Sequence, residues 1–370
     1  MSTPLCPYFN HCGGCTAQHI DYQLQLENKK KQLQTIIKYQ NIQIVYDKEY
    51  FYRNRMDFIF NKESLGLRKK SQWDSIVPIQ KCVIAEEKIN EILNEINLFF
   101  KDCDTFDVKK HSGTFRFSVI RCTPKTSSIS FVLNDKSTKL AEAIEKIKEY
   151  SQFTKVENIL ITYVPPNSDV SISDDYFVIK GSDELQSYYI NKTFFYSTQG
   201  FFQNNHSMAE KMHIYVNNLL KEYETKDSNL LDLYGGVGTF GIINSELFKE
   251  ITIIESFEGS IKSAQKNISI NEIINTKAIV LDAKNLNKLT LKTPLYIITD
   301  PPRTGMDIKT IHAIRALKPK VIIYISCNPI QLGKDLQKFP DYEIKSAALF
   351  DLFPQTPHSE AIVELVPKTI

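Results

Sequence analysis

Five short apolar runs alternate with helical segments in the second half of the chain, and this alternation restricts the fold more than any other feature. Each run holds four or five mostly aliphatic residues, and the runs span 230–233, 251–254, 278–281, 296–299 and 321–325. Strands that are apolar on both faces are typical of a parallel sheet covered by helices on each side. Two later runs, 344–350 and 361–366, suit an antiparallel hairpin. We therefore expect a doubly wound, Rossmann-like α/β domain with a mixed seven-stranded sheet over residues 191–370.

The first 190 residues have a different pattern. Alternating apolar and polar residues at 57–60 and 115–120 suit strands of a half-buried antiparallel sheet, and helical periodicity recurs at 22–37, 86–99 and 139–150. A chain of 370 residues is long enough for two cores. The sequence thus predicts a separate α+β domain over residues 1–190.

Charge and cysteine content restrict the class of protein only loosely. The formal net charge is +2, which neither requires nor excludes a polyanionic partner, because the clustering of Lys and Arg matters more than their sum. The seven cysteines are an odd number in a long chain, which argues against a secreted disulfide framework. The first residues are polar, and the sequence holds no apolar run of roughly 18 residues. We expect a cytoplasmic monomer that does not enter the membrane.

Three cysteines crowd the first fifteen residues, and a distant fourth completes a possible metal-binding set. The four are Cys6, Cys12, Cys15 and Cys82. Structural zinc normally uses two Cys-x-x-Cys pairs, whereas here only Cys12 and Cys15 form such a pair. Three close cysteines and a remote one suit a [4Fe–4S] cluster better. We expect a cluster that ties the amino-terminal loop to residues 77–84, with zinc as the alternative.

A glycine-rich turn at 234–239 follows the first apolar run of the second half. Glycines let the chain turn tightly and let backbone N–H groups approach a ligand. Glu255 and Asp282 end the next two runs, where a ribose and an adenine could meet them. The turn lacks the full Gly-x-Gly-x-x-Gly dinucleotide pattern and a P-loop Lys-Ser/Thr. This combination favours an adenosine cofactor without a pyrophosphate, of which S-adenosylmethionine is the common one.

The last two parallel runs end in residues suited to covalent chemistry. Asp300 begins the motif Asp-Pro-Pro-Arg, and Cys327 stands directly before Asn328 and Pro329, which suit the N-cap and first position of a helix. A helix N-terminus should lower the pKa of the Cys327 thiol. The alternative is that Cys327 is a small buried core residue. Glu360, before the last run, suits a general base, although a solvated carboxylate is the default for such a residue alone.

Taken together and in order, these motifs resemble those of the RNA 5-methyluridine methyltransferases that contain an iron–sulfur cluster. The resemblance covers nearly the whole chain and includes the Gln-Gly-Phe-Phe-Gln-Asn-Asn segment at 199–205 and the His-Ser-Glu segment at 358–360. It implies that Cys327 adds to C6 of the uracil ring and that Glu360 removes the proton from C5. It also implies a set of residues around the cofactor and the target base: Gln203, Tyr234, Thr239, Glu255, Asp282 and Asp300.

The resemblance implies a structured RNA as substrate, with the target base flipped into the site. Basic residues at 52–55 and 66–70 suit contacts with RNA, although a solvated hairpin tip is an equal alternative for the second stretch. The compact chain favours the T-loop uridine of transfer RNA over a uridine of 23S ribosomal RNA. Arg303 and Cys327 argue against a base amino-methyltransferase. A non-catalytic iron–sulfur RNA-binding protein is the more distant alternative.

Overall fold

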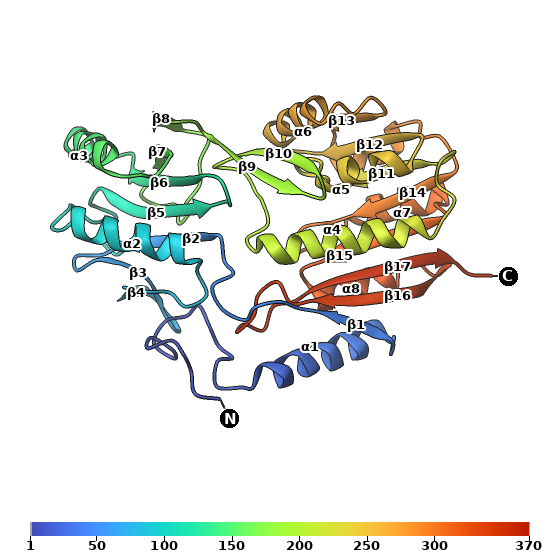
Figure 1. Ribbon diagram of the computed structural model, residues 1–370, viewed down its shortest axis with the longest axis horizontal. Coiled ribbons are helices and arrows are strands. Elements are labelled where there is room, and N and C mark those ends of the chain that lie inside the picture. The colour runs from blue at the N-terminus through green and yellow to red at the C-terminus, as the bar shows by residue number, and fades with distance from the viewer. Residues whose placement is uncertain (1, 370) are drawn as a thin grey trace. The chain divides into compact units, whose positions relative to one another are not determined.

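The computed structural model describes residues 2–369, which form two compact units (Figure 1). Unit 1 holds the residues up to Tyr22, Lys48–Ser187 and Ser197–His206, and unit 2 holds Gln23–Asp47, Tyr188–Tyr196 and the chain from Ser207 onward. The expected single boundary near residue 190 is therefore wrong for the segment 23–47. That segment belongs to unit 2 because its strand pairs with a strand near the end of the chain, about 300 residues away in sequence.

The sheet of unit 2 has eight strands in the order β1-β16-β17-β15-β14-β11-β12-β13. Neighbouring strands are parallel except that β17 runs antiparallel to both β15 and β16. The expected parallel strands and closing hairpin are confirmed, and β1 is an eighth strand that the sequence pattern did not reveal. The strands are β1 (Ile42–Val45), β11 (Asn229–Leu233), β12 (Glu250–Glu255), β13 (Thr276–Val280), β14 (Leu295–Thr299), β15 (Val321–Ser326), β16 (Tyr342–Phe350) and β17 (Glu360–Pro367).

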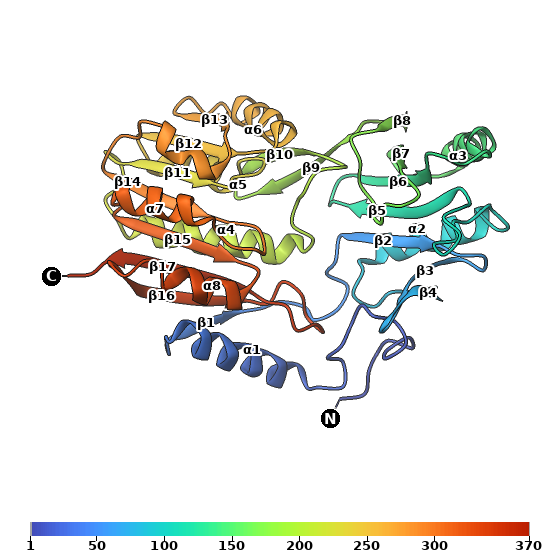
Figure 2. The ribbon, with the colours of Figure 1, turned by 180° about the vertical axis from the view of Figure 1, so that it is seen from behind.

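Helices cover both faces of this sheet. Helix α4 crosses the face turned toward the viewer in Figure 1, and α7 and α8 lie on the face seen in Figure 2. Aliphatic side chains such as Leu33, Ile311 and Leu332 pack from α1, α7 and α8 into one buried cluster with the strands. The helices of unit 2 are α1 (Tyr22–Ile37), α4 (His206–Lys221), α5 (Thr239–Ile243), α6 (Glu258–Ile270), α7 (Ile308–Leu317) and α8 (Pro329–Leu336), with the short 3₁₀ turns η1 (Ser245–Leu247) and η2 (Ala283–Lys288).

Unit 1 is the expected α+β structure, built on a seven-stranded sheet in the order β4-β3-β2-β5-β6-β7-β8. All neighbours are antiparallel except β6 and β7. Helices α2 (Glu87–Phe99) and α3 (Leu140–Phe153) contribute to its buried core. The strands of this sheet are β2 (Arg55–Phe60), β3 (Leu65–Lys69), β4 (Gln72–Pro78), β5 (Phe115–Cys122), β6 (Ser127–Asn134), β7 (Asn158–Val164) and β8 (Tyr176–Lys180). The next two strands, β9 (Glu184–Tyr189) and β10 (Lys192–Ser197), form a separate two-stranded sheet, and residues 188–196 of it belong to unit 2.

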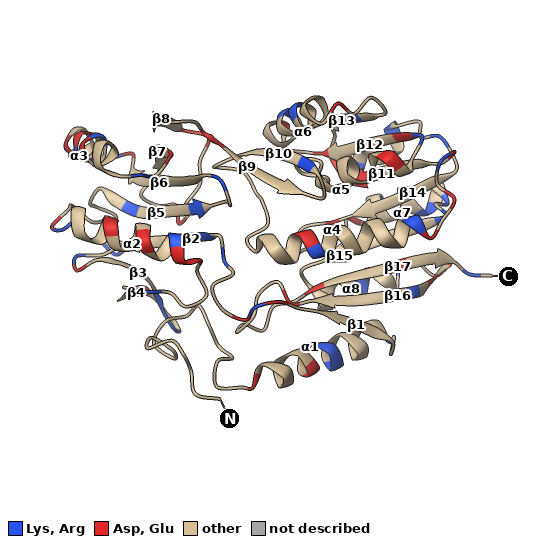
Figure 3. Ribbon diagram, in the orientation of Figure 1, with Lys and Arg blue, Asp and Glu red and all other residues tan. Residues whose placement is uncertain are grey.

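Aromatic rings fill much of the core of unit 1. The ring of Phe100 lies 5.0 to 5.5 Å, centroid to centroid, from those of Phe115, Phe131 and Tyr150. Such tilted and edge-to-face contacts add to the gain from burial. Lys and Arg positions are mixed with Asp and Glu positions in both units (Figure 3), in agreement with the small net charge. Among the described residues, no helix is both long and apolar enough to cross a lipid bilayer.

Candidate active site

The glycine-rich turn of unit 2 joins β11 to α5 and has a backbone that most residues could not adopt. Gly236 and Gly238 have positive φ angles of 53° and 86°. At Gly238 an added Cβ would also lie 3.0 Å from Cδ1 of Ile253, so that both conformation and space favour glycine. A buried carboxylate stabilises the turn, because the N–H of Gly241 donates to Oδ2 of Asp232 over 2.8 Å. The turn therefore forms a fixed rim at the carboxyl end of β11.

Glu255, at the end of β12, is held toward this turn. Its Oε2 accepts the N–H of Gly236 over 3.3 Å, and its Oε1 accepts the N–H groups of Ser256 and Phe257 over 2.7 and 3.0 Å. Asp282 follows β13, where it caps η2 by accepting the N–H of Lys284 over 3.0 Å. The carboxyl ends of adjacent parallel strands share one edge of the sheet. The structure thus places Glu255, Asp282 and the turn residues Tyr234 and Thr239 along that edge.

Cys327 and Glu360 come together through the pairing of β15 with β17. In this antiparallel pair Ser326 lies opposite Ala361, so the next position along the same register brings Cys327 opposite Glu360. Asp300 follows β14, which is the parallel neighbour of β15. Glu360 is only 5% exposed, and within residues 2–369 its Oε2 has no hydrogen-bond partner. A buried carboxyl oxygen without a partner, facing a thiol, is the arrangement expected of a group reserved for a ligand.

The expected lowering of the Cys327 pKa is wrong for this structure. Asn328 does cap α8 and Pro329 is its first residue, as the sequence indicated. Burial, together with the charges of Glu360 and Asp300, nevertheless raises the pKa of the thiol to about 11. The charge of Arg303 and its hydrogen bond to Cys327 act in the opposite direction. Desolvation and two acidic neighbours therefore outweigh the helix N-terminus.

Other buried acids lie along the same edge of the sheet as this thiol. Burial raises the pKa of Asp232 to about 7, and burial with the charge of Asp232 raises the pKa of Asp300 to about 7. Burial, with a contribution from Asp300, raises the pKa of Glu360 well above its ordinary value. Perturbed carboxyls gathered at one sheet edge are typical of functional sites. Such a cluster of acids favours a cationic ligand, whose charge would stabilise the ionised carboxylates.

Asp232 was not predicted as a site residue, and Arg303 served only to exclude a base amino-methyltransferase, although both belong to motifs of the site. The signal that could have singled them out is their position at the carboxyl ends of β11 and β14. Gln203 belongs to unit 1, where its backbone carbonyl accepts from Nδ2 of Asn54 over 3.2 Å. Its expected place beside the cofactor and the target base stays a prediction.

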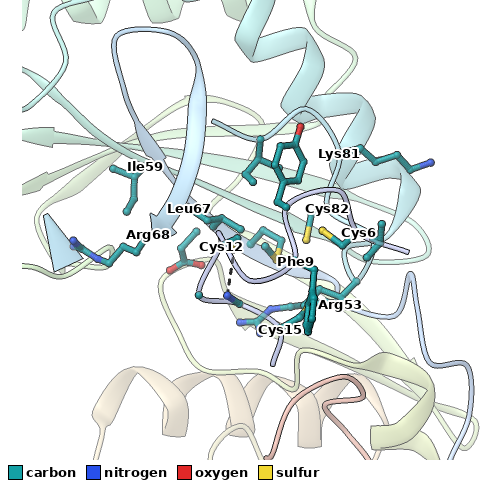
Figure 4. A pocket seen from close by; sticks show the side chains of 18 of the residues that line it. Cys6, Phe9, Cys12, Cys15, Arg53, Ile59, Leu67, Arg68, Lys81 and Cys82 are labelled. Carbon is teal, nitrogen blue, oxygen red and sulfur yellow. Dashed lines mark hydrogen bonds between the residues drawn. The ribbon is translucent and has the colours of Figure 1, made fainter. Parts of the chain in front are cut away.

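Unit 1 contains a cavity of about 500 Å³ with cysteines in its wall (Figure 4). Bonds to the β3–β4 hairpin hold the cysteine loop, since the N–H of Gly13 donates to the carbonyl of Arg68 and the N–H of Lys70 donates to that of His11. Within residues 2–369, no three His, Cys, Asp or Glu side chains lie close enough together to hold a single metal ion. The four cysteines singled out in the sequence all line this cavity: Cys6, Cys12, Cys15 and Cys82.

The thiols of this cavity are close enough to influence one another. Burial raises the pKa of Cys15 to about 12, and the charges of Cys82 and Cys6 contribute to the increase. Asn90 fixes the segment at Cys82, because its Oδ1 accepts the N–H of Cys82 over 2.7 Å and its Nδ2 donates to the carbonyl over 3.1 Å. Cys82 thus lines the same cavity as the three amino-terminal cysteines although it is far from them in sequence, and the cluster expected there stays a prediction.

Comparison with known proteins agrees with this geometry. Residues 21–368 match the family model described as tRNA (Uracil-5-)-methyltransferase. An uncharacterized RNA methyltransferase of Nanoarchaeum equitans is 33% identical over 98% of this chain and 80% of its own length. The tRNA (uracil(54)-C(5))-methyltransferase of Pyrococcus abyssi is 29% identical over 98% of this chain and 86% of its own length.

A solved structure shows the same fold. The crystal structure of the Pyrococcus abyssi tRNA (uracil-54, C5)-methyltransferase in complex with S-adenosyl-L-homocysteine has a TM-score of 0.81 and 27% sequence identity to this chain. The match covers 96% of this chain and 86% of that one. Because the family model spans nearly all of the sequence, this protein is an RNA (uracil-C5) methyltransferase and belongs to the tRNA (uracil-5-)-methyltransferase family.

Proposed function

We propose that this protein methylates C5 of the T-loop uridine of transfer RNA, with S-adenosylmethionine as the methyl donor and Cys327 as the covalent nucleophile. The observation that carries the proposal is the register of β15 and β17, which brings Cys327 opposite Glu360, whose Oε2 has no hydrogen-bond partner within residues 2–369, at the edge where Asp300 also lies. The Pyrococcus relatives named for uracil 54 of tRNA support this substrate over ribosomal RNA.

The chemistry follows from the weak nucleophilicity of uracil C5. The Cys327 sulfur, after loss of its proton, adds to C6 of the ring and places negative charge on C5 and O4. S-adenosylmethionine supplies a methyl group on a positively charged sulfur, and C5 takes this methyl group. Glu360 then accepts the proton that remains on C5, the ring double bond re-forms, and the bond between Cys327 and C6 breaks. As the bond from C5 to the methyl group forms, the bond from the donor sulfur to that methyl group breaks, and S-adenosylhomocysteine leaves as a neutral thioether. The proton that Cys327 loses at the start goes to water, the C5 proton goes to Glu360, and the Cys327 thiolate is regenerated, so atoms and charges balance.

The edge of the sheet offers contacts for the donor. We assign the ribose to Glu255, whose carboxylate is held by backbone N–H groups. We assign the adenine edge to Asp282, which is exposed beyond β13. Tyr234, Thr239 and Asp300 complete the set on unit 2, and the assignment of Gln203 to the cofactor and target base stays a prediction. The acidic surroundings of the site suit a cationic donor better than its neutral product.

The cysteine cavity suits a [4Fe–4S] cluster held by Cys6, Cys12, Cys15 and Cys82. Zinc requires all of its sulfur ligands at about 2.3 Å, whereas a four-iron cluster is a larger body whose ligands stand further apart. Thiols spread over the wall of a cavity fit the larger group. Bound there, the cluster would cross-link the amino-terminal loop to the segment at Cys82. The reducing cytoplasm, in which we place the protein, keeps such thiols free, and all seven cysteines are free in the described structure.

The covalent mechanism can be tested with a transcript of tRNA in which uridine is replaced by 5-fluorouridine. Fluorine at C5 cannot be removed as a proton, so the protein should remain attached to the RNA after denaturation. Cys327→Ala should abolish the adduct, and the matched control Cys103→Ala should retain it. Glu360→Gln should form the adduct with ordinary tRNA and release it slowly.

Two outcomes would contradict the proposal. Adduct formation by Cys327→Ala would show that Cys327 is not the nucleophile. Methylation of 23S ribosomal RNA, together with inactivity on tRNA, would change the substrate and leave the chemistry in place.

The cluster has its own test, which needs no RNA. Protein purified without oxygen should be brown, absorb near about 400 nm through thiolate-to-iron charge transfer, and contain iron and sulfide in equal amounts. Cys82→Ser should lose the colour, and Cys103→Ser should keep it, since Cys103 does not line the cavity. A colourless sample with one zinc ion per chain would overturn the cluster.

A further inference from the structure

Two hydrogen bonds attach helix α8 and its N-cap residue to the loop between β14 and α7. Nδ2 of Asn328 donates to the carbonyl of Arg303 over 2.9 Å. At the end of the loop, Oδ2 of Asp335 accepts the N–H of Met306 over 2.9 Å. Asn328 is the N-cap of α8, and Asp335 lies in its last turn. The loop of Arg303 and the turn of Cys327 are therefore attached to the same helix.

Asn328 makes two different hydrogen bonds with one side chain. Its Oδ1 accepts the N–H of Gln331 over 3.3 Å and so caps α8, while its Nδ2 reaches across to Arg303. An amide offers a donor and an acceptor, whereas Asp has only acceptors and Ser has one short hydroxyl. Either of these residues could cap the helix, but neither could also donate to a carbonyl on the opposite side. The hydrogen bond to Arg303 thus gives Asn328 a second function, which Asp or Ser as N-cap could not provide.

Asp335 is a buried carboxylate with a full set of donors. It is 0% exposed. Besides Met306, it accepts from the hydroxyl of Tyr324 at 2.8 Å, from Nε2 of Gln331 at 3.0 Å and from Nζ of Lys338 at 2.9 Å. A carboxylate satisfied on both oxygens has little freedom to move. The carboxyl end of the Arg303 loop is therefore rigidly anchored.

The loop also lies directly against the helix. Gly305 has a φ of 78°, and an added Cβ would lie 2.4 Å from Oδ2 of Asp335 and 2.5 Å from Cγ of Gln331. Such distances leave no room for a side chain. Any rearrangement that moves the loop must break one of the two tethers.

The position of this loop affects the charges beside Cys327. The carboxyls of Glu360 and Asp300 disfavour a thiolate at Cys327, and the guanidinium of Arg303 opposes them by charge and by a hydrogen bond to the sulfur. Arg303 is largely exposed, so burial of its own side chain does not fix its position. The backbone of Arg303 is fixed, and the residue that fixes it is Asn328.

We propose that Asn328 is a positioning residue, supported by Asp335, which holds the Arg303 loop so that the guanidinium lies against the Cys327 sulfur and stabilises its anion. This inference rests on the proposed role of Cys327 and adds a specific device for activating it. Asn328 contacts neither substrate in this scheme and acts through Arg303.

The test measures the reactivity of Cys327 without RNA or methyl donor. Iodoacetamide reacts with thiolates, so its rate with Cys327 as a function of pH, followed by mass spectrometry of the peptide that contains it, reports the anion. Asn328→Asp and Asn328→Ser retain a helix cap, and each should slow the reaction about tenfold at pH 8, which corresponds to one unit of pKa. Arg303→Gln should slow it to the same degree, and the double variant Asn328→Ser/Arg303→Gln should be no slower.

A matched control uses the same substitution elsewhere in unit 2. Asn271 bridges α6 to β10 through the backbone of Thr193, at 2.9 and 2.7 Å, and has no link to Arg303. Asn271→Ser should lower the melting temperature and leave the Cys327 rate within about twofold of the wild type. The proposal is overturned if Asn328→Ser and Asn328→Asp react at the wild-type rate, or if the slowing adds to that of Arg303→Gln. Absence of a fluorouridine adduct in the wild type would instead refute the proposed function and leave this measurement unaffected.

Discussion

At the scale of single residues, the most informative one is Cys327, because its surroundings contradict a simple rule. A helix N-terminus should favour a thiolate, yet burial and two carboxyls raise the pKa of this thiol to about 11. The motif revealed which cysteine matters and which helix follows it. It could not reveal the sign of the shift, because Glu360 stands 33 positions further along the chain and meets Cys327 only through the pairing of β15 with β17.

A raised pKa predicts that the charge of the methyl donor controls the nucleophile. With the thiol largely protonated at pH 7.5, a cation bound nearby should favour its ionisation. An analogue that carries a protonated amine in place of the methyl sulfonium should accelerate alkylation of Cys327 by about tenfold or more over S-adenosylhomocysteine, since unit charges a few Å apart interact by several kcal/mol near a protein surface. The two ligands have nearly the same shape, so each should block access of the alkylating reagent to the thiol to the same extent.

The measurement is the pH profile of Cys327 alkylation with each ligand at saturation. The profile should shift to lower pH with the charged analogue. Identical profiles would show that the protein alone sets the ionisation of Cys327 and that the acidic neighbours are neutral in the complex.

At the scale of elements, the segment before Glu360 is attached to the first helix by a buried ion pair. Nζ of Lys29, on α1, lies 2.6 Å from Oδ1 of Asp351, and their side chains are 7% and 0% exposed. Nearby, Nε2 of Gln25 donates to Oε1 of Gln355 over 3.1 Å. These contacts explain why α1 belongs to unit 2: it supports the connection that leads from β16 to the proposed base.

Lys29→Met should therefore destabilise unit 2 strongly. The substitution removes a cation from a buried carboxylate, which costs about 3–5 kcal/mol. The double variant Lys29→Met/Asp351→Leu should recover much of that loss. Urea unfolding of the three proteins measures these differences.

An exposed ion pair provides the control. Lys262 and Glu258 on α6 are 72% and 69% exposed, so Lys262→Met should cost less than about 1 kcal/mol. Equal losses for Lys29→Met and Lys262→Met would show that the buried pair has no structural role.

Elements with a local signal in the sequence are where that signal predicts them, whereas elements that depend on long-range pairing leave no such signal. Helix α1 covers the predicted residues 22–37, and the five parallel strands lie where their apolar runs are. Strand β1 has only four residues, too few for a clear pattern, and its partner β16 begins 300 positions later. Only tertiary pairing identifies it. For the same reason Asp335, which is charged and buried, gave no sign in the sequence of the loop that it holds.

At the scale of the whole molecule, the buried acids of the site destabilise the folded protein when they ionise without a cationic ligand. Asp232 and Asp300 have pKa values of about 7 in the folded chain, far above the ordinary value of an aspartate. At low pH both carboxyl groups are protonated in the folded protein and in the unfolded chain. As the pH rises from about 4 to about 7, the unfolded chain loses them first, so these two groups make the folded protein less stable.

The ligand-free protein should accordingly melt at least about 3 °C lower at pH 7.5 than at pH 5.5, because roughly 1 kcal/mol moves the melting temperature of a chain of this size by a few degrees. Asp300→Asn, which cannot ionise, should reduce this difference. S-adenosylmethionine at saturation should reduce it more than S-adenosylhomocysteine does, since only the former brings a sulfonium charge to the acids. If Asp300→Asn keeps the full pH dependence, the destabilising charge lies elsewhere and the acidic site is neutral at pH 7.5. If it loses the dependence and the two ligands stabilise the wild type equally, the acids respond to burial alone, and the donor's charge has no part in the activation of Cys327.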